Sequence, residues 1–217
     1  CFVSDQSSVI LNGVSSSEDS TLHYQTLLSR YSFSKKPGFI SIFSGALESH
    51  KNPELLLDAL IHLKRSSRLE GIFSFFLGFG PLEDVLRQKI NDNGLQEQVF
   101  LCGYQDNVLD WMAHADLLVF PSSGEGLPYT LLEAMSVACP VLAMDVPGCN
   151  ELIEDDITGR LLPSHSVEGL AEAILDSYKN PKCIEGYART AKESVLKKYS
   201  LEKMLLETKA LYQSFLF

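Results

Sequence analysis

Short apolar runs alternate along this chain with longer segments in which apolar residues recur at every third or fourth position. Runs that are apolar throughout are typical of parallel strands buried on both faces. The longer segments predict amphipathic helices, such as the one that Asn52 caps and Pro53 begins. The apolar runs themselves predict strands at residues 39–45, 73–78, 99–103, 117–120, 141–144 and 159–162.

Strands that alternate with helices predict an α/β fold, here a Rossmann-like, doubly wound parallel sheet of about six strands with right-handed crossovers. Ligands of such sheets bind beyond the carboxyl ends of the strands, near the point where the strand order reverses. After Val167 the chain is expected to be helical, and residues 8–14 are expected to form a further short strand. The loops that should share the carboxyl edge begin at Gly45, Gly78, Gly103, Pro121 and Asp145.

The stretch of residues 116–145 combines a buried strand, a turn and a helix start. In the turn, Gly124 and Gly126 would permit the close approach of a bound group and, if needed, a positive φ. Pro128 suits the first position of a helix, because its missing N–H would have no partner there. A helix is therefore expected over about residues 128–138.

This helix start predicts an anion site, because its free N–H groups and positive dipole end would face the carboxyl edge of the sheet. Glu125 lies on the loop before the helix, and Glu133 lies in its second turn. Helical side chains lean towards the N-terminus, so both carboxylates reach one cleft and could accept hydrogen bonds from sugar or ribose hydroxyls. The alternative is that Glu125 is solvated and that Glu133 is an ordinary exposed helix residue.

The composition fits one large α/β domain, because 45% of the 217 residues are hydrophobic and can build a substantial core. A net charge of −10 opposes binding to nucleic acid or to anionic lipid, whose phosphates it would repel. No apolar run approaches the ~20 residues that a membrane span requires. The five cysteines and five histidines show no metal-ligand spacing, so the sequence predicts no metal and no cofactor.

The stretch of residues 121–143 resembles the E-x7-E signature of retaining glycosyltransferases of the group 1 type (family 4, GT-B fold), with Glu125 and Glu133 as the two acids. The resemblance extends from about Val9 to the end of the chain and implies the carboxy-terminal half of a GT-B fold. Further segments that resemble family motifs, in the same order, are residues 9–14, 79–81, 115–116 and 145–153.

The resemblance implies a role for each matching residue. Glu125 would bind hydroxyls of the donor sugar, Glu133 would accept from the ribose, and Lys51 would meet the diphosphate as a point charge. Glu125 and Lys51 are thus the predicted catalytic residues. The other predicted donor-binding residues are Gly126, Leu127, Pro128, Tyr129, Thr130 and Leu131 at the helix start, with Gly45, Ala46, Gly80, Tyr104 and Gly148 on neighbouring loops.

Two of these positions carry a qualification. Tyr104 falls where the family contacts the base, but it could equally be a buried structural tyrosine. Ala46 replaces an arginine that family members commonly use to pair with the diphosphate. Because a bidentate cation is lost there, Lys51 or His50 would have to carry the positive charge.

The resemblance also implies how the chain is organised. Residues 1–38 would link two domains, residues 39–200 would bind the nucleotide-sugar, and residues 201–217 would pack on an amino-terminal domain that holds the acceptor site. Alone, this half is expected to bind nucleotide weakly and to be inactive. Membrane contact would occur only through the other domain.

The implied reaction moves a hexose or N-acetylhexosamine from a UDP-sugar to a lipid-linked or polysaccharide acceptor. The setting would be bacterial O-antigen or capsule synthesis, in the cytoplasm at the inner face of the cytoplasmic membrane. One alternative is an inactive donor-binding or interaction domain of the same fold, because Ala46 removes a phosphate contact. A dinucleotide oxidoreductase has less support, since Glu83 stands at the third glycine position of G-x-G-x-x-G.

Overall fold

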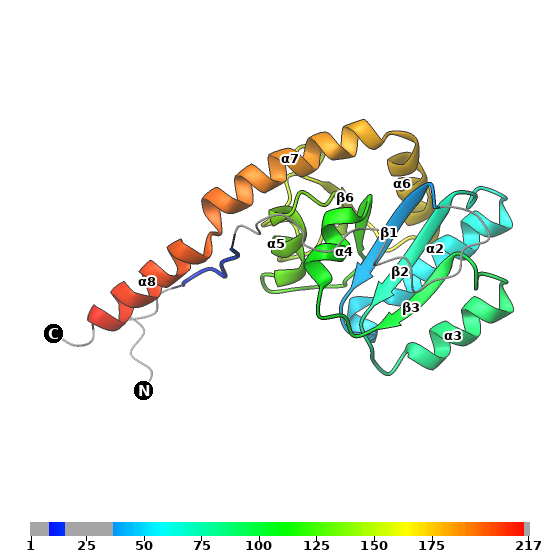
Figure 1. Ribbon diagram of the computed structural model, residues 1–217, viewed down its shortest axis with the longest axis horizontal. Coiled ribbons are helices and arrows are strands. Elements are labelled where there is room, and N and C mark those ends of the chain that lie inside the picture. The colour runs from blue at the N-terminus through cyan, green and yellow to red at the C-terminus, as the bar shows by residue number, and fades with distance from the viewer. Residues whose placement is uncertain (1–8, 16–36, 215–217) are drawn as a thin grey trace.

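A parallel six-stranded sheet forms the centre of the molecule (Figure 1). The computed structural model describes residues 9–15 and 37–214. The strand order is β3-β2-β1-β4-β5-β6, and neighbouring strands are parallel throughout. This confirms the predicted α/β fold. The strands are β1 (Phe39–Ser44), β2 (Ile72–Leu77), β3 (Val99–Gly103), β4 (Leu117–Phe120), β5 (Val141–Met144) and β6 (Arg160–Leu162).

Helices cover both faces of the sheet. Side chains of α2, α3 and α6 pack in one hydrophobic core, and those of α4 and α5 pack in a second core across the sheet. Helix α7 contributes to both cores. The helices are η1 (Ser49–Lys51), α2 (Pro53–Arg65), α3 (Glu83–Asp92), α4 (Val108–His114), α5 (Tyr129–Ser136), α6 (Val167–Lys179), α7 (Pro181–Lys198) and α8 (Leu201–Ser214).

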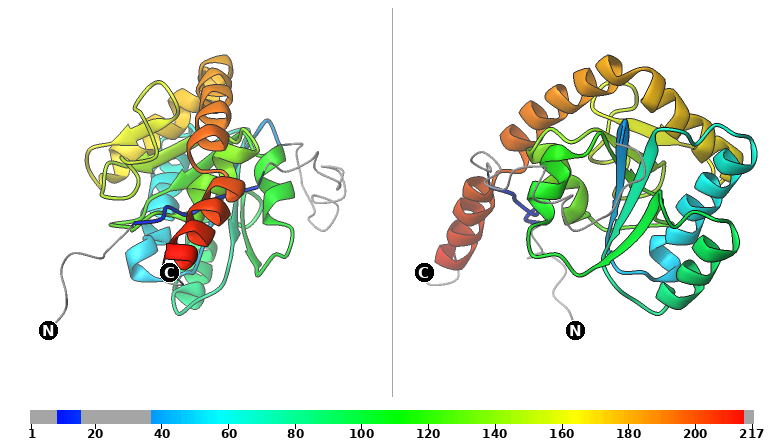
Figure 2. Two further views of the ribbon diagram at one scale, coloured as in Figure 1. Left: turned by 90° about the vertical axis from the view of Figure 1, so that its left-hand side faces the viewer. Right: turned by 45° about the vertical axis from the view of Figure 1, so that its right-hand side comes forward.

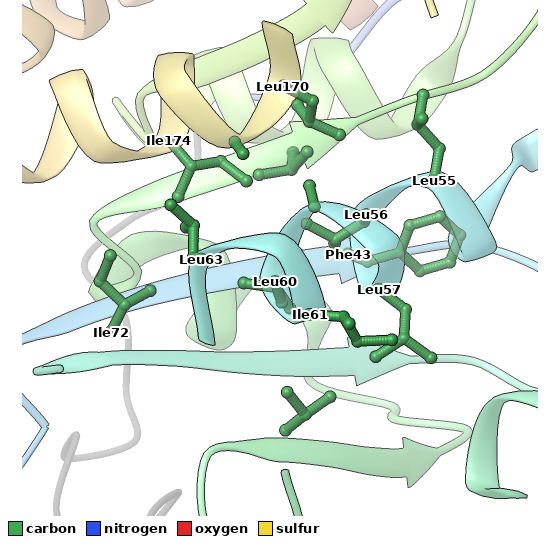
Figure 3. Close-up of a cluster of buried hydrophobic side chains, with 14 of the residues drawn as sticks. Phe43, Leu55, Leu56, Leu57, Leu60, Ile61, Leu63, Ile72, Leu170 and Ile174 are labelled. Carbon is green, nitrogen blue, oxygen red and sulfur yellow. The ribbon is translucent and has the colours of Figure 1, made fainter. Parts of the chain in front are cut away.

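Burial on both faces explains why the central strands consist mainly of apolar residues. All six residues of β1 and all six of β2 are buried, because helices lie on both sides of them. Figure 3 shows Leu56, Leu60 and Leu63 of α2 beside Leu170 and Ile174 of α6, over the strands. Burial of this apolar surface is the main favourable contribution to the stability of the fold.

The strand order reverses between β1 and β4. Strand β1 pairs with β2 on one side and with β4 on the other. The chain leaves β1 for α2 on one face and leaves β4 for α5 on the opposite face. The two loops therefore diverge at the carboxyl edge, which is where ligands of such sheets bind.

Two predicted helix starts differ in detail. Helix α5 begins at Tyr129, because Pro128 has an extended ψ of 116° and is the residue before the helix rather than its first. The helix also ends earlier than expected, at Ser136. Asn52 precedes α2, but its side chain makes no capping hydrogen bond. Its φ of 53° places it in the left-handed region, which asparagine tolerates better than most residues.

The predicted strand at residues 8–14 is wrong for the described part, residues 9–14. Val14 makes an isolated bridge with Ser200, and its N–H donates to the Tyr199 carbonyl at 2.8 Å. The segment packs at the junction of α7 and α8, away from the edge strands β3 and β6, so it has no strand to pair with. Ser8 lies outside the described residues.

Helix α8 projects from the rest of the molecule, as the right-hand view of Figure 2 shows. None of its described residues is buried, and Leu205 and Leu206 are 56% and 61% exposed. A cavity of about 560 Å³ lies beside it and is lined by Val14, Leu196, Leu201, Leu205 and Leu206 among others, none of them on the loops at the carboxyl edge of the sheet. None of the helices in the described ranges is both long enough and apolar enough to span a bilayer.

Gly78 provides a test of how tightly the loops at the carboxyl edge pack. Its φ is +140°, and a Cβ at this position would lie 1.9 Å from the Gly45 carbonyl oxygen. We expect Gly78→Ala to lower the free energy of unfolding by at least ~2 kcal/mol, because a backbone clash adds to backbone strain. Chemical denaturation followed by circular dichroism measures this change.

Gly186 is the matched control, because a Cβ there would meet nothing within 4 Å inside α7. Gly186→Ala should stabilise the protein by about 0.5–1 kcal/mol through higher helix propensity. A Gly78→Ala variant as stable as the Gly186→Ala variant would contradict the close contact.

Candidate active site

The loop after β1 carries Gly45, Ala46 and Lys51 and is held by the loop after β2. The Leu47 N–H donates to the Phe79 carbonyl, and the Leu47 carbonyl accepts from the Leu82 N–H, both at 3.0 Å. A Cβ on Gly80 would lie 2.6 Å from the Leu47 carbonyl oxygen, so only glycine permits this approach. The short helix η1 then ends at Lys51.

The loop after β4 is held from two sides. The Ser123 N–H donates to the His50 carbonyl at 2.9 Å, and the Glu125 N–H donates to the Pro147 carbonyl at 3.3 Å. Gly148, with φ +81°, lies directly against this loop, since a Cβ there would be 2.4 Å from the Gly126 carbonyl oxygen. The structure thus brings the loops after β1, β4 and β5 together at one edge.

Lys51 and Glu125 form an ion pair across the reversal of strand order. The distance between Lys51 Nζ and Glu125 Oε1 is 2.6 Å, and the two side chains are only 20% and 13% exposed. The ammonium group also lies 5.5 Å from the centre of the Phe120 ring. The alternative of a solvated Glu125 is therefore wrong, and the sequence did not predict this direct contact.

The pair can do more than hold two loops together. An ammonium group has three N–H donors, so Lys51 can keep one contact with Glu125 and offer the others to an anion. The second oxygen of Glu125 remains an acceptor for hydroxyl donors. Because the pair is shielded from water, the Lys51 ammonium group interacts more strongly with an adjacent anion than it would on an open surface, and the Glu125 carboxylate opposes part of that attraction.

Cys149 is fully buried next to this pair. Burial, with a smaller contribution from the nearby Glu125 carboxylate, raises the pKa of its thiol to about 12. The thiol is therefore neutral at physiological pH and a poor nucleophile.

Glu133 lies in α5 and is half-buried, which contradicts the alternative of an ordinary exposed residue. Desolvation by burial raises the pKa of its carboxyl group. Its side chain forms no hydrogen bond or ion pair with any residue in the two described ranges. A half-buried carboxylate without a partner is well suited to accept hydrogen bonds from a ligand.

The backbone at the start of α5 has fewer free donors than the sequence suggested. The Leu131 N–H donates to the Pro128 carbonyl at 3.1 Å, whereas Tyr129 and Thr130 occupy the first turn, where amides have no intrahelical partner. Gly124 and Gly126 do not have the positive φ that the sequence allowed, and a Cβ on either would meet nothing within 4 Å. The loop is therefore open beside both glycines.

Two exposed aromatic side chains follow the neighbouring strands β2 and β3. Tyr104 is 70% exposed, so the alternative of a buried structural tyrosine is wrong. Phe79 is 64% exposed. Gly78 and Gly103, the residues directly before Phe79 and Tyr104, form an isolated β-bridge with each other. Phe79 lies in the segment 79–81 that resembles a family motif, but no binding role was predicted for its ring, although an aromatic residue between two glycines at a strand end was a usable signal. Such rings are suited to stacking on a base.

Two further residues that support the site had no local signal in the sequence. The Asn12 side-chain amide donates to the Leu127 carbonyl at 3.1 Å, across a separation of 115 residues. His165 Nε2 lies 3.3 Å from the Ser122 carbonyl oxygen, 43 residues away. Over the described ranges, no group of three or more His, Cys, Asp or Glu side chains is placed to hold a metal ion.

Comparison with known proteins identifies the family. Residues 27–194 match the family described as glycosyl transferases group 1. The chain is 30% identical over 177 residues to alpha-D-kanosaminyltransferase of Streptomyces kanamyceticus. The aligned region covers 81% of this chain and 45% of that protein. It is 22% identical over 179 residues to UDP-Gal:alpha-D-GlcNAc-diphosphoundecaprenol alpha-1,3-galactosyltransferase of Escherichia coli. That alignment covers 82% of this chain and 46% of the relative.

A solved structure agrees in fold. The glycosyltransferase from Rickettsia africae ESF-5 superimposes with a TM-score of 0.83 over 96% of this chain and 57% of that chain, at 20% sequence identity. This chain spans about half the length of the curated relatives it matches. Because the family match extends over more than half of its residues, the chain belongs to the glycosyl transferases group 1 family.

Proposed function

We propose that this chain is the donor-binding part of a retaining family 4 glycosyltransferase that uses a UDP-sugar. The observation that carries the proposal is the shielded Lys51–Glu125 pair at the reversal of strand order, beside the first turn of α5. A cation, a free carboxylate oxygen and helix-start amides are the groups that a nucleotide diphosphate sugar requires.

Each group has a part in the proposed reaction. Lys51 and the amides of Tyr129 and Thr130 bind the diphosphate and stabilise the negative charge that develops as it leaves. This contribution is electrostatic and needs no covalent bond to the protein. Glu125 orients the sugar by accepting from its hydroxyls, and Glu133 accepts from the ribose. Tyr104 and Phe79 offer a surface for the base.

The donor and the acceptor are proposed from the relatives. The Escherichia coli relative is named for a UDP-Gal donor and a diphosphoundecaprenol-linked acceptor. A hexose or N-acetylhexosamine donor and a lipid-linked or saccharide acceptor fit this precedent, in bacterial O-antigen or capsule synthesis. Acceptor contacts and any membrane contact at the inner face of the cytoplasmic membrane belong to parts of the protein beyond the donor-binding domain.

A second candidate function is an inactive donor-binding domain. Ala46 lies on the loop after β1 and supplies no cation, so Lys51 must neutralise the diphosphate while it also contacts Glu125. Release of free sugar from a UDP-sugar by the full-length protein would exclude this candidate. Binding of UDP without any release or transfer of sugar would support it.

Lys51→Ala should weaken binding of UDP at least tenfold and leave binding of uridine nearly unchanged. The expected loss follows from removing a charge-assisted contact worth about 1.5–3 kcal/mol. Titration of the chain with UDP, GDP, uridine and NAD, followed by NMR, measures these affinities. Equal losses for UDP and uridine would refute the assignment of Lys51, and binding of NAD alone would refute the transferase function.

Two controls accompany this variant. Lys182→Ala removes an exposed lysine of α7 and should change neither affinity. Lys51→Ala leaves the shielded Glu125 carboxylate without its partner, which can destabilise the fold. The double variant Lys51→Ala/Glu125→Gln removes that charge, so its thermal melt and UDP affinity separate loss of the fold from loss of the phosphate contact.

Glu133 should make nucleoside binding depend on pH. Burial raises the pKa of Glu133 in the free protein, and hydroxyl donors favour its ionised form, so binding must lower that pKa. Affinity for uridine is therefore highest above the free-protein pKa and falls as the pH decreases through it. As the pH is lowered, the loss of uridine affinity should begin at a higher pH than it would for a glutamate with the ordinary pKa of 4.5.

Uridine is the appropriate ligand for this test, because it carries no phosphate that titrates in the same range. Glu133→Gln should bind uridine more weakly at neutral pH and show a flat pH profile between pH 7.5 and 5. An unchanged pH profile in the Glu133→Gln variant would show that another group accepts from the ribose.

A further inference from the structure

We propose that Asn12 is a positioning residue of the donor site, which holds the loop after β4 in place for the diphosphate. The inference rests on the proposed function. Its first observation is the hydrogen bond from Asn12 Nδ2 to the Leu127 carbonyl oxygen, 3.1 Å long and partly buried. Asn12 belongs to residues 9–15, which contribute no strand to the sheet.

The hydrogen bond from Asn12 constrains the orientation of the Leu127–Pro128 peptide. The peptide that joins Leu127 to Pro128 has no N–H, because proline lacks one. Its carbonyl oxygen is therefore the one polar atom through which a hydrogen bond can fix its orientation. Pro128 directly precedes α5, and its ring fixes φ, so the plane of this peptide and the ψ of Pro128 together set the direction in which the amide of Tyr129 points at the start of α5.

The other side of the segment is equally constrained. A Cβ on Gly13 would lie 2.7 Å from the Ser200 carbonyl oxygen and 2.8 Å from Leu201 Cα. Val14 donates to the Tyr199 carbonyl at 2.8 Å and accepts from the Leu201 N–H at 3.0 Å. Residues 12–14 therefore form a short strap between the junction of α7 and α8 and the loop after β4.

The same junction also reaches the loop after β5. The Tyr199 hydroxyl lies 3.4 Å from the Glu151 carbonyl oxygen, on the loop that carries Gly148. Gly148 in turn packs on the Glu125–Gly126 peptide. A displacement of the α7–α8 junction would therefore be transmitted to the loop after β4 through two sets of contacts. One runs through Tyr199 and Gly148, and the other, through Asn12, involves fewer residues.

The test uses Asn12→Leu, which is neutral and close to asparagine in size but has no N–H donor. We expect UDP to bind about fivefold more weakly, as the loss of one neutral hydrogen bond implies, while uridine affinity stays within about twofold. Hydrogen exchange of peptides that cover residues 122–132 should become faster in the variant without ligand. The thermal melting temperature should change little.

Asn180→Leu is the matched control. The Asn180 side-chain amide donates to both the carbonyl and the carboxylate of Asp176 at the C-terminal end of α6. Helix α6 begins after the carboxyl end of β6, so its C-terminal end is remote from the edge that carries the candidate site. This variant loses two side-chain hydrogen bonds, one more than Asn12→Leu, but it should leave UDP affinity and the exchange of residues 122–132 unchanged.

The outcomes separate the two proposals. If the unmodified chain does not bind UDP, the proposed function is refuted, and the exchange measurement still decides whether Asn12 holds the loop. If Asn12→Leu matches the unmodified chain in exchange or in UDP affinity, the positioning role is refuted. Parallel losses of UDP affinity, uridine affinity and melting temperature would show a general structural role and would also overturn the proposal.

Discussion

The candidate site depends on one constraint, the reversal of strand order between β1 and β4. Because β1 lies next to both β2 and β4, the loops that leave β1 and β4 go to opposite faces, and in such sheets ligands bind in a crevice at this point. Lys51 and Glu125 stand on opposite sides of that crevice, 74 residues apart in sequence. Their contact is shielded from water, so separating them without a ligand would leave two uncompensated charges. The pair thereby holds the two walls in a fixed relation.

Glycine backbone contacts give the walls their shape. Gly80 packs on the loop after β1, and Gly148 packs on the Glu125–Gly126 peptide, each at distances where any side chain would collide with backbone. Close backbone packing leaves the loops little freedom to rearrange. Binding groups that are fixed before the ligand arrives lose less conformational entropy on binding.

The fold could be predicted from sequence because its signals are local. Strands β3, β4 and β5 begin and end where the apolar runs do, since both faces of these strands are covered. Glu125 and Glu133 could be named as candidates because they belong to one short motif with a fixed spacing. The position of Pro128 was missed because its ring suits both the first helical residue and the residue before it, and only ψ distinguishes these.

What the sequence could not predict are contacts between distant segments. Neither the Lys51–Glu125 distance nor the hydrogen bond from Asn12 to Leu127 has a periodicity or a neighbouring residue that would signal it. The exposure of Tyr104 also depends on how the loops after β2 and β3 pack, which no local pattern encodes.

Helix α7 has a consequence for how the domain unfolds. Ile184 near its start belongs to the core on one face of the sheet, and Ala191 and Val195 further along belong to the core on the other face. Because this continuous helix contributes side chains to both cores, the loss of one core disturbs the other. The two layers are thereby coupled into a single cooperative unit, and the loops of the site, which draw on both layers, share its stability.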